Sequence, residues 1–228
     1  QQYYQDFAVR VGNWAQNSNG GHIWIIGNEP NLEWERPHDQ TITAAMYADC
    51  FNRCYNEIKS RPGCANDQVV IAGIGPWNVQ SGDWIPYFTN ILNAVKPNVD
   101  GITIHTYTHG TDPNLVFSDQ KMDPPYNDRY YHFRAYLNFM HAIPSDLRHL
   151  PVYLTETDCN EPWVNSNTGW VRNAYKEIND WNQTPGNQQI RCVALYCWIN
   201  RGDGFYINSK GGVHEDWKAA MDFHYTWN

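Results

Sequence analysis

The sequence has little charge and no cluster of basic residues. Charged residues make up only 18% of the 228 residues, and the formal net charge is -8. No run of Lys or Arg offers a positive stripe for a phosphate backbone, so we expect no nucleic-acid partner. The negative net charge also disfavours an anionic polymer as a ligand.

Long apolar runs and several familiar motifs are missing as well. No apolar stretch approaches the roughly 20 residues that cross a bilayer, and nothing resembles a signal peptide, so we expect no membrane partner. There is no Gly-x-Ser-x-Gly elbow, which argues against a serine α/β hydrolase. Paired Cys-x-x-Cys spacing is absent too, which argues against zinc. We expect no metal and no cofactor.

Cysteine is present in an even number, and many pairings are open. Three cysteines lie near one predicted helix and three near the last two predicted strands, so a disulfide within each cluster is expected: Cys50, Cys54 and Cys64, and Cys159, Cys192 and Cys197. An even count with few charges favours an extracellular, secreted protein.

Aromatic residues are abundant. They make up 15% of the chain and include 11 Trp and 15 Tyr. Their flat apolar faces suit stacking on sugar rings, although a Trp-rich core would explain them equally well.

Short apolar runs alternate with longer amphipathic stretches, which is typical of βα units around a parallel sheet. Five runs are predicted as strands: His22 to Gly27, Val69 to Ile74, Gly101 to Thr106, Val152 to Thr157 and Arg191 to Trp198. Helical periodicity predicts helices over residues 5 to 17, Thr43 to Ser60, Trp84 to Val95, Tyr130 to His141, Trp170 to Asn182 and Glu215 to Tyr225.

Polar residues gather where these predicted strands end, and they include two carboxylates, Glu29 and Glu156. The runs at the strand ends are Gly27-Asn28-Glu29-Pro30-Asn31, His105-Thr106-Tyr107, Thr155-Glu156-Thr157-Asp158 and Trp198-Ile199-Asn200. A carboxylate at the end of a buried strand is costly unless something pairs or uses it. Two carboxylates brought together by distant strands are what glycoside hydrolysis requires.

These motifs carry a family resemblance. Asn28-Glu29-Pro30 after an apolar strand and Glu156 at the end of a later strand resemble the (β/α)8-barrel clan of retaining glycoside hydrolases. In that clan the acid/base ends strand four and the nucleophile ends strand seven. His105 and Tyr107 on the strand between, and Trp198 on the strand after, strengthen the likeness.

The resemblance implies a role for each matching residue. Glu29 would be the general acid and later the base, and Glu156 the nucleophile of a double displacement on a β-linked glycan. Asn28 would bind the sugar 2-hydroxyl, and Tyr107 or His105 would contact the nucleophile. Trp198 would form the floor of the subsite beside the scissile bond. Trp34, Trp77 and Trp163 follow strand ends and are candidates for outer subsites.

Each assignment has a structural alternative. Glu29 could pair with Arg36 or Arg53, and Glu156 could cap the following helix. His105 and Tyr107 could be satisfied core residues, and each Trp could simply pack in the core.

The predicted fold is α/β, a partial (β/α) TIM-type barrel, read as one catalytic domain over residues 1–228. Its strands match strands four to eight of the clan, whereas strands one to three are not evident. A truncated chain, a naturally shortened barrel and two chains that complete each other all remain open. Open sheet edges would then be covered by a missing N-terminal segment, by loops or by a second copy in a homo-oligomer. If the missing strands are needed for positioning, the protein would be a catalytically weak or inactive carbohydrate-binding relic.

Overall fold

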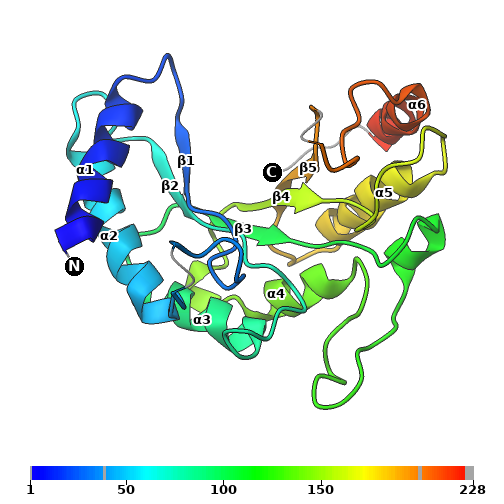
Figure 1. Ribbon diagram of the computed structural model, residues 1–228, viewed down its shortest axis with the longest axis horizontal. Coiled ribbons are helices and arrows are strands. Elements are labelled where there is room, and N and C mark those ends of the chain that lie inside the picture. The colour runs from blue at the N-terminus through cyan, green and yellow to red at the C-terminus, as the bar shows by residue number, and fades with distance from the viewer. Residues whose placement is uncertain (1, 38–39, 200–201, 224–228) are drawn as a thin grey trace. The chain divides into compact units, whose positions relative to one another are not determined.

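The computed structural model describes residues 2–37, 40–199 and 202–223. Helices and parallel strands alternate along the chain (Figure 1). The chain divides into two compact units. The first comprises Gln1–Ile104 and Ala142–Pro151, and the second comprises His105–His141 and Val152–Asn228.

The first unit contains the strands and helices of the N-terminal half. Strands β1 and β2 pair in parallel, with Ile23 opposite Gln68, and Val70 of β2 forms a parallel bridge with Gly101, just before β3. The elements are α1 (Gln2–Gln16), β1 (Ile23–Ile26), α2 (Ala44–Ser60), β2 (Gln68–Ile71), α3 (Trp84–Val95), the start of β3 (Ile102–His105) and the short η3 (Ser145–Leu147).

Side-chain caps define where the helices of this unit begin. The Thr43 hydroxyl accepts a hydrogen bond from the Met46 amide at the start of α2, and Asp83 accepts one from the Ile85 amide at the start of α3. Such caps satisfy amides that have no partner within the helix. The buried face of α3 includes Phe88, which is 0% exposed. A large apolar side chain buried in this way contributes about 1.5–3 kcal/mol.

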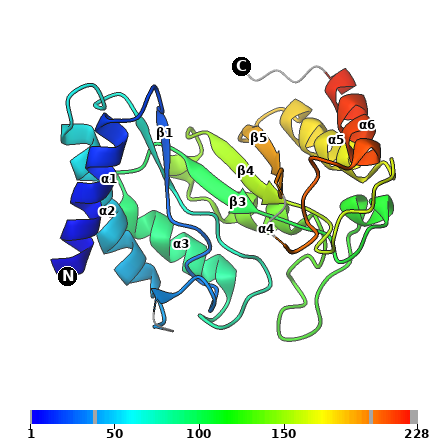
Figure 2. The same cartoon turned by 45° about the horizontal axis from the view of Figure 1, so that its top comes forward.

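The second unit is built around the parallel pair β4 and β5. The Thr106 amide, directly after β3, donates to the Glu156 carbonyl in β4, and α5 packs beside α6 (Figure 2). The elements are η2 (Pro113–Phe117), α4 (Ala135–Ala142), β4 (Val152–Thr157), α5 (Trp170–Gln183), β5 (Ile190–Leu195), α6 (Gly211–Ala220) and η4 (Met221–Phe223).

Helix α5 begins with a cap supplied from α6. Gly169, at the N-cap position, has no side chain to accept a hydrogen bond. The buried carboxylate of Asp216 instead accepts from the amides of Val171 and Arg172 at 2.9 and 3.2 Å. A carboxylate in this place also interacts favourably with the helix dipole.

The predicted elements are confirmed, with shifts at their ends. The predicted helix over Tyr130 to His141 begins only at Ala135, because Tyr130 forms an antiparallel bridge with Lys121 and donates its amide to the Asn138 side chain. The last helix begins earlier than predicted, at Gly211. Tyr225, the predicted end of that helix, and Asn200 lie outside the described residues.

The predicted disulfides are wrong. All six cysteines lie in the described part of the chain, and none of them forms a disulfide there. Cys50 and Cys54 sit one helical turn apart on α2, where their thiols share a hydrogen bond that lowers the pKa of Cys50. The thiols of Cys159 and Cys197 donate instead to nearby carbonyls, those of Glu161 and Ile199. Local thiol contacts therefore replace the expected bridges.

Within the residues that the structure describes, no helix has the length and hydropathy needed to span a membrane.

Candidate active site

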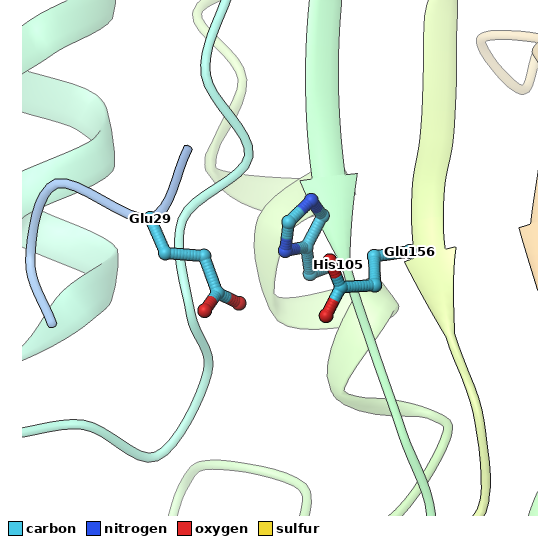
Figure 3. Close-up of side chains that lie close together, drawn as sticks. All are labelled: Glu29, His105 and Glu156. Atoms are coloured by element: carbon cyan, nitrogen blue, oxygen red, sulfur yellow. The ribbon is translucent and has the colours of Figure 1, made fainter. Parts of the chain in front are cut away.

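Glu29 lies in the first unit, on the tight turn that follows β1 (Figure 3). Its amide donates to the Gly73 carbonyl after β2, and its own carbonyl accepts from the Leu32 amide. Its backbone has a φ of 33°, a conformation that non-glycine residues seldom adopt. The residue is only 6% exposed. A buried carboxylate held on a strained turn is typical of a functional site.

The position of the Glu29 carboxyl group depends on Gly75. A methyl group added at Gly75 would approach the carboxyl carbon of Glu29 to 3.2 Å and the side chain of Leu32 to 3.1 Å. Asn31 holds Gly75 in place through hydrogen bonds to both its amide and its carbonyl. A larger residue at position 75 would therefore require Leu32 or the Glu29 carboxyl group to shift by a few tenths of an ångström.

Asn28 is exposed and lines a cavity of about 370 Å³. Glu29 does not line this cavity, so the side chains of the two neighbouring residues lie in different surroundings. The other lining residues come mainly from α1, α2 and the loop after β1, and they include Tyr4, Phe7, Met46 and Cys50.

Trp34 and Trp77 follow β1 and β2 in the same unit. Trp34 is 73% exposed, and Trp77 is partly exposed with a positive φ of 61°. The loop that carries Trp34 is tied to the loop after β2, because Gln80 donates to Glu33 at 2.6 Å and Arg36 donates to Ser81 at 2.7 Å. Trp34 thus exposes its aromatic ring on a loop that is held by hydrogen bonds to the loop after β2.

Glu156 lies in the second unit, where three side chains form a hydrogen-bonded chain with it. The Tyr107 hydroxyl donates to Glu156 Oε1 at 2.8 Å and lies 3.3 Å from His105 Nδ1. His105 Nε2 lies 3.1 Å from the Thr155 hydroxyl. His105 and Glu156 come from neighbouring strands in Figure 3. Of the two residues expected near Glu156, Tyr107 contacts it directly, and His105 joins the group through Tyr107 and Thr155.

The structural alternatives for the two carboxylates are a helix-capping role for Glu156 and an ion pair with Arg36 or Arg53 for Glu29. Asp216 occupies the N-terminus of α5, so Glu156 is not the cap of the helix that follows it. The guanidinium of Arg36 donates to Asn31, Thr41 and Ser81. Arg53 forms an ion pair with Asp49 on α2.

The remaining predicted tryptophans divide into one exposed and one buried residue. Trp198 is 54% exposed, and its ring stacks on His214 with centroids 5.5 Å apart. Trp163 is buried, and its indole donates to the Tyr196 carbonyl at 2.7 Å. Trp163 therefore packs in the core, and its prediction as an outer subsite is wrong.

Comparisons with known proteins place the fold among glycoside hydrolases. No protein-family model matches the chain, and no curated protein sequence matches it. Among solved structures, a monomeric beta-xylosidase from Caulobacter crescentus CB15 matches 98% of the chain with a TM-score of 0.56 at 16% identity. A family 44 endoglucanase from Clostridium acetobutylium ATCC 824 matches 96% with a TM-score of 0.56 at 11% identity.

A third match is an alpha-L-arabinofuranosidase from Thermotoga maritima, which covers 83% of the chain with a TM-score of 0.53 at 15% identity. The chain spans less than half of each structure: 46% of the xylosidase, 48% of the endoglucanase and 36% of the arabinofuranosidase. These identities show a shared fold. The prediction of an α/β fold with parallel strands, of the kind found in glycoside hydrolases, is thereby confirmed.

The contacts of Asn31 and Thr155 could not be predicted from the sequence. Asn31 stands in the polar run after the first predicted strand, but its partner Gly75 lies 44 residues away, and no local pattern links them. Thr155 precedes Glu156 in a strand, where alternation would point the two side chains to opposite faces.

Proposed function

We propose that the protein is a retaining glycoside hydrolase that cleaves a β-linked glycan by double displacement. Glu29 acts as the acid/base and Glu156 as the nucleophile. The observation that carries the proposal is the hydrogen bond from Tyr107 to Glu156 at the end of β4, in a chain that shares its fold with glycoside hydrolases.

The two carboxylates have the surroundings that these roles require. Glu29 is 6% exposed and lies beside Gly75 on a tight turn, which supports its assignment as the acid/base. Glu156 accepts a hydrogen bond from a phenol, which favours the ionised form that attacks the sugar.

The neighbouring residues have proposed roles in sugar binding. Asn28 binds the 2-hydroxyl, and Tyr107 and His105 hold the nucleophile. Trp198 forms the floor of the subsite beside the scissile bond, and Trp34 and Trp77 form outer subsites. The ring of Trp34 is exposed on a loop that is hydrogen-bonded to its neighbour, and this supports the proposal that it stacks on a sugar face.

The decisive experiment is trapping with a 2-fluoro β-glycoside that carries an activated leaving group. We expect a covalent adduct on Glu156, located by peptide mass spectrometry, because the fluorine slows hydrolysis of the glycosyl-enzyme. Glu156→Gln should form no adduct. Glu161→Gln, which changes an exposed carboxylate in the same loop, should label normally. An adduct elsewhere, or none in the unchanged protein, contradicts the assignment.

The role of Glu29 is tested by changing the leaving group. Glu29→Gln should slow cleavage of glycosides with poor leaving groups by about 10²–10⁴-fold, while a dinitrophenyl glycoside, which needs no protonation, should form its adduct at nearly the normal rate. Glu35→Gln, on the same exposed loop, is the matched control. Equal losses on both substrates would contradict an acid role.

A second candidate function is a non-catalytic carbohydrate-binding protein that keeps the fold. The observation that favours it is the length of the chain, which spans less than half of the matched enzymes. Glycan binding without an adduct or turnover would support this alternative. Secretion of the protein is proposed as well, since its substrate would be an extracellular polysaccharide.

A further inference from the structure

The strand that carries Glu156 contains an irregularity at that residue. Leu154 of β4 lies opposite Val193 of β5, and Thr157 lies opposite Leu195. Three steps along β4 therefore match two steps along β5, and the extra residue falls in the segment of Thr155 and Glu156. A β-bulge of this kind changes the direction of a side chain.

The bulge explains contacts that a regular strand would not allow. Consecutive residues of a strand point to opposite faces, whereas residues two apart share a face. His105 is the last residue of β3, and Tyr107 lies two residues further along the chain. Thr155 contacts the first and Glu156 contacts the second, although Thr155 and Glu156 are consecutive in β4. The bulge thus brings the Thr155 hydroxyl and the Glu156 carboxylate to the same pair of side chains, His105 and Tyr107.

When the imidazole is neutral and Glu156 is ionised, one placement of the protons satisfies the three contacts that Glu156, Tyr107, His105 and Thr155 make with one another. An ionised carboxylate can only accept, so the single proton of the Tyr107 hydroxyl goes to Glu156. His105 Nδ1 must then donate to the Tyr107 oxygen. A neutral imidazole carries one N–H, so Nε2 is an acceptor, and the Thr155 hydroxyl is its donor.

We propose that Thr155 is a positioning residue that holds His105 in its Nδ1–H tautomer and thereby commits the Tyr107 proton to Glu156. The effect on catalysis rests on the proposed function, whereas the tautomer is a property of the resting protein. Without the Thr155 donor, His105 can carry its proton on Nε2. Nδ1 then accepts from Tyr107, and Glu156 loses the Tyr107 hydrogen bond.

The tautomer is measured on ¹⁵N-histidine-labelled protein by long-range ¹H–¹⁵N correlation, with His105 assigned from the signal lost in His105→Gln. We expect Nδ1–H in the unchanged protein and in Thr155→Ser. In Thr155→Val, a nearly isosteric change that suits a strand, we expect the Nε2–H form to appear. An Nε2–H or doubly protonated ring in the unchanged protein would overturn the proposal, as would an unchanged tautomer in Thr155→Val.

The kinetic consequence is measured as the rate of Glu156 labelling by the 2-fluoro glycoside. Loss of a hydrogen bond to a charged group predicts labelling about tenfold slower in Thr155→Val, with recovery in Thr155→Ser and a similar loss in Tyr107→Phe. Equal rates in Thr155→Val and the unchanged protein would overturn the link to catalysis. Failure of every variant to label would overturn the proposed function, and the tautomer would still decide the role of Thr155.

Discussion

The side-chain amide of Asn31 exchanges two hydrogen bonds with the backbone of Gly75. Nδ2 donates to the Gly75 carbonyl at 2.8 Å, and Oδ1 accepts from the Gly75 amide at 2.9 Å. Asn31 is 1% exposed, so water cannot readily replace its side chain. This pair joins the loop after β1 to the segment after β2 and keeps Gly75 against Glu29.

Asn31→Ala should destabilise the protein by about 2–4 kcal/mol, because it leaves a buried amide and a buried carbonyl without partners. Urea unfolding checks this expectation. Asn17→Ala, at an exposed site whose amide bonds only to the preceding helical turn, serves as the control. A change in Asn31→Ala no larger than in this control would contradict the role of the pair.

Gly75→Ala tests the position of Glu29 more directly. The added methyl group would stand 3.2 Å from the Glu29 carboxyl carbon, so the carboxyl group must move. We expect kcat for a substrate with a poor leaving group to fall by at least about tenfold, since small displacements of a catalytic group are costly. Gly211→Ala, where the new methyl group meets nothing within 4 Å, is the matched control. Full activity in Gly75→Ala would show that Glu29 does not depend on this contact.

We expect the carboxyl group of Asp67 to make the free energy of unfolding depend on pH. Burial raises the pKa of its carboxyl group, but hydrogen bonds from His22, Trp24 and Cys64 outweigh burial and hold the pKa below its ordinary value. Because the pKa is lower in the folded state than in the unfolded state, the carboxylate stabilises the fold at neutral pH. That contribution falls as the pH drops below about 4, where the unfolded chain takes up the proton first.

The measurement is the free energy of unfolding between pH 7 and pH 3 for the unchanged protein and for Asp67→Asn. The unchanged protein should be the more stable one at pH 7, and the difference should shrink as the pH falls through 4. Asp222→Asn, at an exposed position, should follow the unchanged protein. A constant difference across this range would refute the linkage.

Because no cysteine forms a disulfide in the described residues, we expect reducing and non-reducing conditions to give the same stability. Because all six are thiols, a thiol reagent should titrate six groups in the denatured, unreduced protein. Dithiothreitol should leave Tm unchanged within about 1 °C, since no loop closure is lost on reduction. A titre of four or fewer, or a fall in Tm on reduction, would point to a disulfide.

The exposed side of β1 predicts self-association. Ile23 and Ile25 are 52% and 42% exposed, and β1 is the outer strand of its two-stranded sheet with β2. Open strands with apolar side chains tend to pair with other chains. We expect concentration-dependent dimers in sedimentation velocity, and we expect Ile23→Lys with Ile25→Lys to abolish them. Val79→Lys, at an exposed residue after β2, is the control. A monomer at all concentrations would contradict the prediction.

Much of the local structure could be predicted because it depends on short-range patterns. The apolar face of α3 repeats with helical period, so Trp84 and Val95 were correct as its ends. Thr43 precedes α2 as a cap, and the alternation of strands and helices indicated a parallel α/β fold. The start of α4 could not be predicted this way, since the contacts of Tyr130 with Lys121 and Asn138 override the helical pattern.

The sequence by itself indicated that Glu29 and Glu156 lie at the ends of two apolar strands and that His105 and Tyr107 lie at the end of a third. Only the tertiary structure decided what surrounds these residues. The bulge that joins Thr155 to His105 and the pairing of Asn31 with Gly75 arise between segments more than 40 residues apart. Their geometry depends on how the strands pair and pack, and residue order alone does not specify that.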